Sequence, residues 1–303
     1  MNADGAPGFE HWQDERLAQV ERALSDWVRA DAPAGLGQAM RYAVLDGGKR
    51  LRPLLVLAAA EAVRGNPQAA LRAACAVELI HAYSLVHDDL PCMDNDVLRR
   101  GKPTAHVQFG QAQALLAGDA LQALAFELLT PDGADVPPAM QAMLCRLLAR
   151  AAGADGMAGG QAIDLQNVGR QLDEAVLRDM HQRKTGVLLR TSVLLGAACA
   201  GRPLPQASSQ ALRRYGAAVG LAFQVVDDIL DVTAESAQLG KTAGKDAASG
   251  KPTYVSLLGL EGARAHADAL LAQALAALDG ATGLPGGIWR LDALARQMAR
   301  RVC

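Results

Sequence analysis

The segment ACAVELIHAYSLVHDDLPCMD, residues 74–94, decides how the chain folds. Its first part is apolar with the spacing of a buried helix, and it ends in three aspartates, Asp88, Asp89 and Asp94. A second segment, GAAVGLAFQVVDDILD at residues 216–231, repeats this arrangement of an apolar helical stretch that runs into an aspartate cluster. Because the chain shows such helical patterns and no alternating strand pattern of useful length, the sequence predicts an all-α fold.

The composition favours helices and a large core. The chain has 303 residues, 50% of them apolar, and we expect one domain over residues 1–303. A net charge of −2 gives no general attraction to nucleic acid or to an anionic membrane, so we expect neither as a partner. The five cysteines are scattered without a CxxC pair, residues 1–15 lack a signal-peptide pattern, and no uninterrupted apolar run reaches transmembrane length. We therefore predict a cytoplasmic protein with reduced thiols.

Glycines and prolines divide the expected helices. A helix at Leu36–Asp46 should stop at the glycine pair that follows it, and Pro53 should occupy the first position of the next helix. Residues 95–104 are expected to form a polar connection, and residues 233–251 one long loop that is a candidate lid. Further helices are expected at 68–87, 105–117, 119–129, 138–152, 155–168, 173–183, 185–200, 206–231 and 287–302.

The second aspartate cluster is a polar stripe within an apolar helix. Gln224, Asp227, Asp228 and Asp231 have the spacing i, i+3, i+4 and i+7, which puts them on one helix face. A solvated charged face is the alternative, but the apolar residues around the stripe disfavour it. Crowded carboxylates on a buried face are costly unless a cation compensates them. Magnesium prefers oxygen ligands and shares its shell with substrate phosphates, so the stripe predicts magnesium and a phosphate- or diphosphate-bearing substrate.

The first cluster is expected to face the same cavity. Asp88 shares a helical stripe with His81 and Ser84. Pro91 should break this helix, so that Asp94 can turn back toward the cavity. Such a string is weak evidence by itself because acidic turns are common, but the second cluster strengthens it.

Basic residues flank the acidic clusters. Lys49, Arg50 and Arg52 lie in a glycine-led loop that enters a helix, where backbone amides also attract anions. Further cations follow the first cluster or lie nearer the second: Arg99, Arg100, Lys184, Lys241 and Lys251. An ordinary surface charge is the alternative for each of them. Together they predict two anion sites, one bridged by metal to carboxylates and one held directly by lysine and arginine.

These motifs resemble the trans-isoprenyl diphosphate synthase family, with the bacterial farnesyl diphosphate synthases (geranyltranstransferases) as the nearest group. The matching strings are GGKRLRP (47–53), HAYSLVHDDLPCMDNDVLRRGKPTAH (81–106), GGQAIDL (159–165), KTGVLLR (184–190), FQVVDDILDVT (223–233), LGKTAGKD (239–246) and GKPTY (250–254). The resemblance implies a single-domain helical bundle around a large central cavity, in a homodimer. It also implies a magnesium-dependent, head-to-tail condensation of isopentenyl diphosphate with an allylic diphosphate.

The resemblance further implies a role for each matched residue. Magnesium ions that clamp the allylic diphosphate would be held by Asp88, Asp89, Asp94, Asp227, Asp228 and Asp231. The allylic diphosphate would be contacted by Arg99, Lys184 and Lys241, and isopentenyl diphosphate by Lys49, Arg52, His81 and Arg100. The allylic cation would form beside Thr185 and Gln224, and Lys251 is a further expected substrate ligand. The residues expected to act in the chemical step are Asp88, Asp94, Asp227, Lys184, Arg99 and Gln224.

Product length is expected to depend on Tyr83 and Ser84. They lie about 5–8 Å before Asp88 along the same helix, where a growing chain would extend. In the resembled family a bulky aromatic residue here, with two extra residues inside the first cluster, accompanies a farnesyl product. Geranylgeranyl diphosphate is the alternative product, and ordinary core packing is the alternative role for Tyr83. A terpene cyclase would lack the DDILD string, and a non-catalytic regulatory subunit would lose one aspartate cluster, so both are disfavoured.

Overall fold

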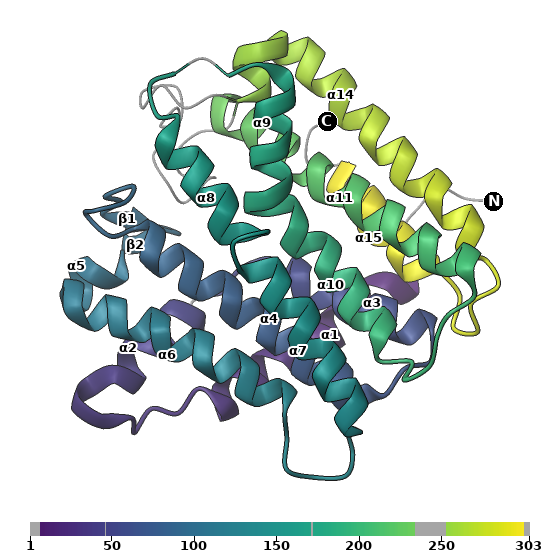
Figure 1. The fold of residues 1–303 in the computed structure, drawn as a ribbon, viewed down its shortest axis with the longest axis horizontal. Coiled ribbons are helices and arrows are strands. Elements are labelled where there is room, and N and C mark those ends of the chain that lie inside the picture. The colour runs from purple at the N-terminus through teal and green to yellow at the C-terminus, as the bar shows by residue number, and fades with distance from the viewer. Residues whose placement is uncertain (1–6, 46, 171, 234–252, 300–303) are drawn as a thin grey trace.

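A computed structural model of the chain describes residues 7–45, 47–170, 172–233 and 253–299. The described chain is all-α except for one short hairpin, as predicted (Figure 1). The α-helices are α1 (Pro7–Trp27), α2 (Leu36–Val44), α3 (Leu51–Ala62), α4 (Pro67–Asp88), α5 (Ala105–Phe109), α6 (Gln111–Leu129), α7 (Pro138–Ala152), α8 (Met157–Gln166), α9 (Glu174–His181), α10 (Val187–Ala198), α11 (Gln206–Thr233), α14 (Tyr254–Leu278) and α15 (Trp289–Ala299). The short elements are the 3₁₀ helices η1 (Pro33–Gly35) and η3 (Asp279–Ala281), the π-helical turn η2 (Gln182–Gly186), and the strands β1 (Leu98–Arg99) and β2 (Lys102–Pro103).

Helix α4 is the central element of the bundle. It packs against α3, α6 and α10, while α10 in turn contacts α3 and α11, and α11 lies along α14 (Figure 1). Its residues from Ala73 to Ile80 are all buried, which explains why the first segment of the sequence is apolar on every side. This packing fixes the position of the C-terminal end of α4, which carries Asp88.

Several helices begin where the sequence supplies a capping residue. The Asn66 side chain accepts a hydrogen bond from Ala69 N at the start of α4, and Asp173 does the same for Val176 N at the start of α9. Thr253 forms a capping box with Ser256 at the start of α14. Each cap satisfies backbone amides that a helix end leaves without an intrahelical partner.

Two expected helix boundaries were wrong. Pro53 occupies the third position of α3, which already begins at Leu51. The break expected at residue 118 lies instead at Gly110, whose φ of +88° ends α5 before α6 begins. Gly118 lies inside α6, where the absence of a side chain leaves room for the His87 ring: a Cβ there would collide with Nε2 of His87. The polar connection at 95–104 holds the two short strands, which form an antiparallel hairpin.

Among the described residues, two helices, α4 and α6, are long and apolar enough to cross a membrane by length and composition, although Glu78 and Asp119 interrupt their apolar runs. Most of the apolar window of α4 is buried by other helices, as is usual for the core helix of a globular bundle. In α6, more of the window is exposed, and Leu115 and Leu116 are about half exposed. The apolar surface of α6 is therefore available for a further contact.

Candidate active site

A cavity of about 330 Å³ opens beside the C-terminal half of α4. Its other walls come from α8, the turn η2 and the start of α10. The lining residues are Arg52, His81, Tyr83, Ser84, Leu85, His87, Asp88, Met93, Met157, Ala158, Gln161, Ala162, Leu165, Lys184, Thr185 and Leu188. The structure thus brings together seven of the predicted site residues: Arg52, His81, Tyr83, Ser84, Asp88, Lys184 and Thr185. Charged groups and an apolar space lie in one cavity, which suits a ligand with an anionic head and a hydrocarbon tail.

Asp88 ends α4, and the chain then turns so that Asp94 lies close to it. Asp94 N donates a hydrogen bond to Asp88 O (2.8 Å), and Met93 N donates to Leu90 O (2.9 Å). This turn agrees with the predicted break near Pro91. Burial raises the pKa of Asp88 to about 6; the Lys184 ammonium lowers it, and the Asp94 carboxylate adds to the rise. Two carboxylates in this setting attract a cation.

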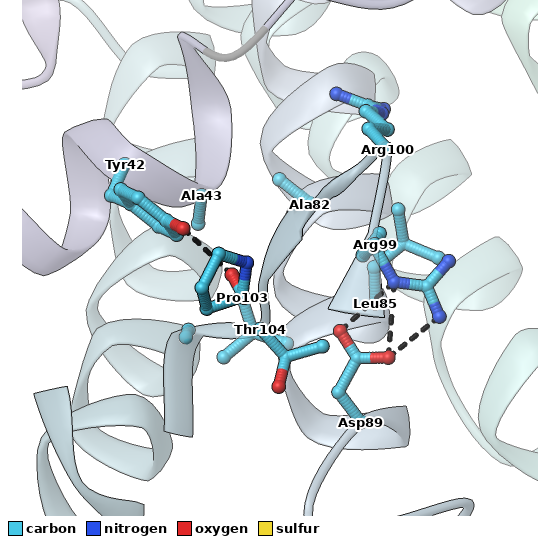
Figure 2. A pocket seen from close by; sticks show the side chains of 11 residues that line it. Tyr42, Ala43, Ala82, Leu85, Asp89, Arg99, Arg100, Pro103 and Thr104 are labelled. Carbon is cyan, nitrogen blue, oxygen red and sulfur yellow. Dashed lines mark hydrogen bonds and ion pairs between the residues drawn. The ribbon is translucent and has the colours of Figure 1, made fainter. Parts of the chain in front are cut away.

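The Asp89 side chain binds the hairpin and, unlike Asp88, is not among the residues that line the cavity. Its buried carboxylate accepts hydrogen bonds from Arg99 Nε and Nη2 at 2.6–3.0 Å (Figure 2). Arg99 also lies 3.7 Å from Asp96. Figure 2 shows Arg99 turned toward Asp89 and Arg100 turned away from it. The predicted metal role of Asp89 and diphosphate role of Arg99 stay predictions, and the pair has a structural role in anchoring the hairpin.

Asp228 in the second cluster is likewise engaged within the protein. One carboxylate oxygen accepts from Gln224 Nε2 and the other from Tyr254 N, both at 2.8 Å. Asp228 therefore ties α11 to the first turn of α14. Gln224, expected to line the cavity, is not among the described residues that line it. The metal role of Asp228 and the cavity role of Gln224 stay predictions that these contacts do not support.

Asp227 on α11 is half-buried and lies close enough to Arg52 for its charge to oppose the lowering of the Arg52 pKa by burial. Asp231, one turn later, is buried. Among the described residues, no three His, Cys, Asp or Glu side chains lie close enough together to hold a metal ion. The chemistry of the donor set nevertheless fits magnesium, because it consists of carboxylate oxygens and the chain turns so that Asp94 lies close to Asp88.

The buried carboxylate of Asp164 positions Lys184, although no individual role was predicted for Asp164. Its Nζ donates to Asp164 Oδ2 at 2.6 Å, and the Asp164 side chain is only 7% exposed. Lys184 and Thr185 lie in the π-helical turn η2, a rare conformation that often marks functional sites. Asp164 belongs to the GGQAIDL string, so its sequence signal was the match of that string to the resembled family. The pair holds a positive charge near Asp88.

Two arginines of the basic loop, residues 47–53, have different surroundings. Buried Arg50 donates to Glu21 (2.6 Å), to Glu78 (2.7 Å) and to Val44 O (2.6 Å). Arg52, two residues later, lines the cavity, and its Nε has no hydrogen-bond partner among the described residues. Arg50 therefore holds the loop, whereas Arg52 lines the cavity, and its diphosphate role stays a prediction.

His81 and Arg100 lie near Arg52, as the predicted direct anion site requires. Burial, and then the charges of Arg52 and Arg100, lower the pKa of His81 well below its usual range, so the imidazole is neutral at pH 7. Arg100 donates to Gly47 O, which links the hairpin to the basic loop, where Lys49 is exposed. Lys241 and Lys251 lie outside the described residues, as does nearly all of the candidate lid at 233–251.

Comparison with known proteins identifies the family of the chain. Residues 33–281 match the model of the polyprenyl synthetase family. The chain is 50% identical over 280 residues to a probable farnesyl diphosphate synthase of Bradyrhizobium diazoefficiens, covering 90% of this chain and 83% of that one. It is 46% identical over 273 residues to a chloroplastic geranylgeranyl pyrophosphate synthase of Capsicum annuum, covering 90% and 73%.

A solved structure shows the same fold. The geranyltransferase of Helicobacter pylori, complexed with magnesium and isoprenyl diphosphate, superposes with a TM-score of 0.86 at 34% identity, covering 99% of this chain and 100% of that one. The family match extends over most of the chain, and the cavity carries the charged and apolar residues described above. The chain therefore belongs to the polyprenyl synthetase family and is a head-to-tail prenyltransferase.

Proposed function

We propose that this enzyme condenses isopentenyl diphosphate with dimethylallyl and geranyl diphosphates to give farnesyl diphosphate. The observation that carries this proposal is the cavity that joins Asp88, Lys184 and Arg52 to a space bounded by Tyr83. The charged groups suit the two diphosphates, and the apolar part suits the hydrocarbon chain. The similar relatives carry both farnesyl and geranylgeranyl names, so the product assignment rests on Tyr83.

The reaction would use the residues of the cavity as follows. The bond between the allylic carbon and its diphosphate oxygen breaks, and the electron pair stays on oxygen. Lys184, held by Asp164, stabilises the departing diphosphate, while Arg52 holds isopentenyl diphosphate. The π-bond of isopentenyl diphosphate then attacks the cation, and the released diphosphate accepts the proton that the new carbon skeleton loses. The apolar lining of the cavity would limit the access of water to the cation.

We propose that magnesium would be held by Asp88, Asp94 and Asp227. Their carboxylate oxygens are suitable ligands, and the magnesium-bound Helicobacter pylori relative supports the choice of metal. Bound magnesium supplies positive charge to the leaving diphosphate. Asp89 and Asp228 would support this site indirectly, because they hold the hairpin and the start of α14 in place.

A direct assay tests the proposed function. Purified protein is incubated with isopentenyl and geranyl diphosphates and magnesium, and the dephosphorylated products are separated by chromatography. We expect a linear farnesyl product. A geranylgeranyl product would correct the chain length, a cyclic hydrocarbon would indicate a terpene cyclase, and no product would indicate a non-catalytic subunit.

Tyr83→Ala should lengthen the product beyond farnesyl. The Tyr83 side chain is 8% exposed, borders the cavity and packs edge-on against His87 with ring centroids 5.7 Å apart. Removing the ring opens space about 7–8 Å before Asp88 along α4, where the growing chain would end. Chromatography of the products measures the shift. Tyr83→Phe, which keeps the ring, is the matched control, and an unchanged farnesyl product from Tyr83→Ala would show that Tyr83 does not stop the chain.

We also propose that the enzyme acts as a cytoplasmic homodimer. The support is an apolar surface that α6 and the neighbouring α7 expose: Leu115, Leu116 and Met143 are each about half exposed. Exposed apolar side chains on adjacent helices are typical of a subunit interface. Sedimentation analysis of the purified protein would measure the mass, and a monomer at micromolar concentration would refute the dimer.

A further inference from the structure

Gln161 has an unusual environment for an amide. It lies on α8, is 8% exposed and lines the cavity. Neither its Nε2 nor its Oε1 has a hydrogen-bond partner among the residues that the structure describes. A buried amide without partners destabilises a fold, and most buried polar side-chain atoms are paired. A ligand in the cavity that accepts hydrogen bonds is an available partner for Nε2.

The backbone around Gln161 brings it close to the segment that carries Lys184. A Cβ on Gly160 would lie 2.2 Å from Lys184 N, so only glycine permits α8 to approach η2 this closely. On the same helix, Asp164 binds Lys184 Nζ. Gln161 and Asp164 are therefore fixed against one turn of η2, with Asp164 bound to the lysine and Gln161 buried in the cavity wall.

Gln161 and Gln224, the glutamine that was expected to line the cavity, differ in what they can do. Gln224 donates to Asp228, which in turn binds Tyr254 N, so its amide is committed to holding α11 against α14. The Gln161 amide has no such contact within the described chain. Of these two glutamines, Gln161 is the one that can bind a substrate without breaking a hydrogen bond of the fold.

The chemistry of the cavity identifies the part of the substrate that Gln161 can bind. The other residues that α8 contributes to the lining are apolar: Met157, Ala158, Ala162 and Leu165. An isoprenyl diphosphate has polar atoms only in its diphosphate, and the charged groups that would surround that diphosphate, Asp88 and Lys184, line the same cavity. A hydrogen bond from the amide N–H to a diphosphate oxygen would pair Nε2 of Gln161 and stabilise the leaving group.

We propose that Gln161 is a catalytic residue that donates a hydrogen bond from its amide N–H to the allylic diphosphate. This inference rests on the proposed prenyl transfer. As the bond between the allylic carbon and oxygen breaks, the electron pair moves onto the diphosphate, and the hydrogen bond strengthens with the charge. No proton is transferred to or from Gln161.

Gln161→Met tests the proposal because methionine keeps the length and lacks the amide. With geranyl and isopentenyl diphosphates we expect kcat to fall about 10- to 150-fold, the range for losing a hydrogen bond to a charged group. The melting temperature of the ligand-free variant should equal or exceed that of the wild type, because an unpaired buried amide is removed. The rise in melting temperature on adding geranyl diphosphate with magnesium should be smaller than for the wild type. Gln166→Met, at an exposed position on α8, is the matched control.

The outcomes separate this inference from the proposed function. If the wild type elongates geranyl diphosphate and Gln161→Met has an unchanged kcat, the role of Gln161 is refuted while the proposed function stands. A lower melting temperature of ligand-free Gln161→Met would also refute it, because the amide would then stabilise the fold. If the wild type gives no elongation, the proposed function fails, and an equal ligand-induced melting shift in both proteins would refute the contact as well.

Discussion

Asp88→Asn lowers turnover at least about 100-fold and raises the stability of the magnesium-free protein at pH 7 by up to about 3 kcal/mol; this is the expected result of removing one carboxylate from the cavity. The loss of turnover follows from the proposed role of Asp88 as a metal ligand. The gain in stability follows from its position, because burial and the Asp94 and Asp89 carboxylates disfavour its charged form more than the Lys184 and Arg99 cations favour it. Function and stability are thus expected to change in opposite directions.

The pH dependence of this gain has a defined sign. Burial raises the pKa of Asp88 to about 6 in the folded protein, compared with about 3.9 in an unfolded chain. A carboxyl group with a raised folded pKa stabilises the fold while it is protonated, and this contribution is lost as the pH rises through about 6. Asp88→Asn should therefore unfold at a higher temperature than the wild type at pH 7 and at the same temperature near pH 4.

Thermal unfolding in the presence of a chelator measures the difference, and steady-state kinetics with magnesium measure turnover. Asp268→Asn, at an exposed aspartate of α14, is the matched control and should change neither quantity. Near-normal turnover of Asp88→Asn would remove Asp88 from the proposed metal site. A variant less stable than the wild type at pH 7 would show that the Asp88 carboxylate is compensated in the free protein.

The fold class and most helices could be predicted because their signals are local. The apolar runs before each aspartate cluster are helices, and the turn that returns Asp94 to Asp88 was expected from Pro91. The helix break was expected at the wrong glycine because glycine serves two purposes in this region. Gly110 and Gly118 differ only in tertiary setting: one adopts a positive φ that ends a helix, and the other leaves room for the His87 ring inside a helix.

The division of labour within the site could be predicted only in part. Spacing put Gln224, Asp227 and Asp228 on one helix face, but it gave no sign that Asp228 would be used by Gln224 and by the start of α14. Those bonds depend on where residue 254 lies in space. Gln161 and Asp164 were missed as individual residues for the same reason, because Lys184 is distant in sequence and reaches Asp164 only after α8 packs on η2.

Arg50 and Arg52 provide the sharpest test of how the fold assigns neighbouring cations. Arg50→Met is expected to destabilise the protein by about 3–5 kcal/mol, because it leaves Glu78 buried without its partner and removes a bond to Glu21. Arg52→Met is expected to keep wild-type stability or exceed it, because its buried guanidinium has an unpaired Nε and a pKa lowered first by burial, although Glu78 and Asp227 oppose that shift.

The kinetic expectation for this pair is the reverse of the stability expectation. Arg52→Met should raise the KM for isopentenyl diphosphate about 10- to 150-fold, even at saturating magnesium, because this diphosphate would be held directly by cations. The folded fraction of Arg50→Met, measured below its melting temperature, should keep a KM close to the wild-type value. If Arg52→Met instead raised only the KM for the allylic substrate, the two diphosphate sites would be assigned the wrong way round. If Arg50→Met unfolded at the wild-type temperature, the buried ion pair with Glu78 would not be what holds the basic loop. The ion pair would then not explain why the two arginines differ.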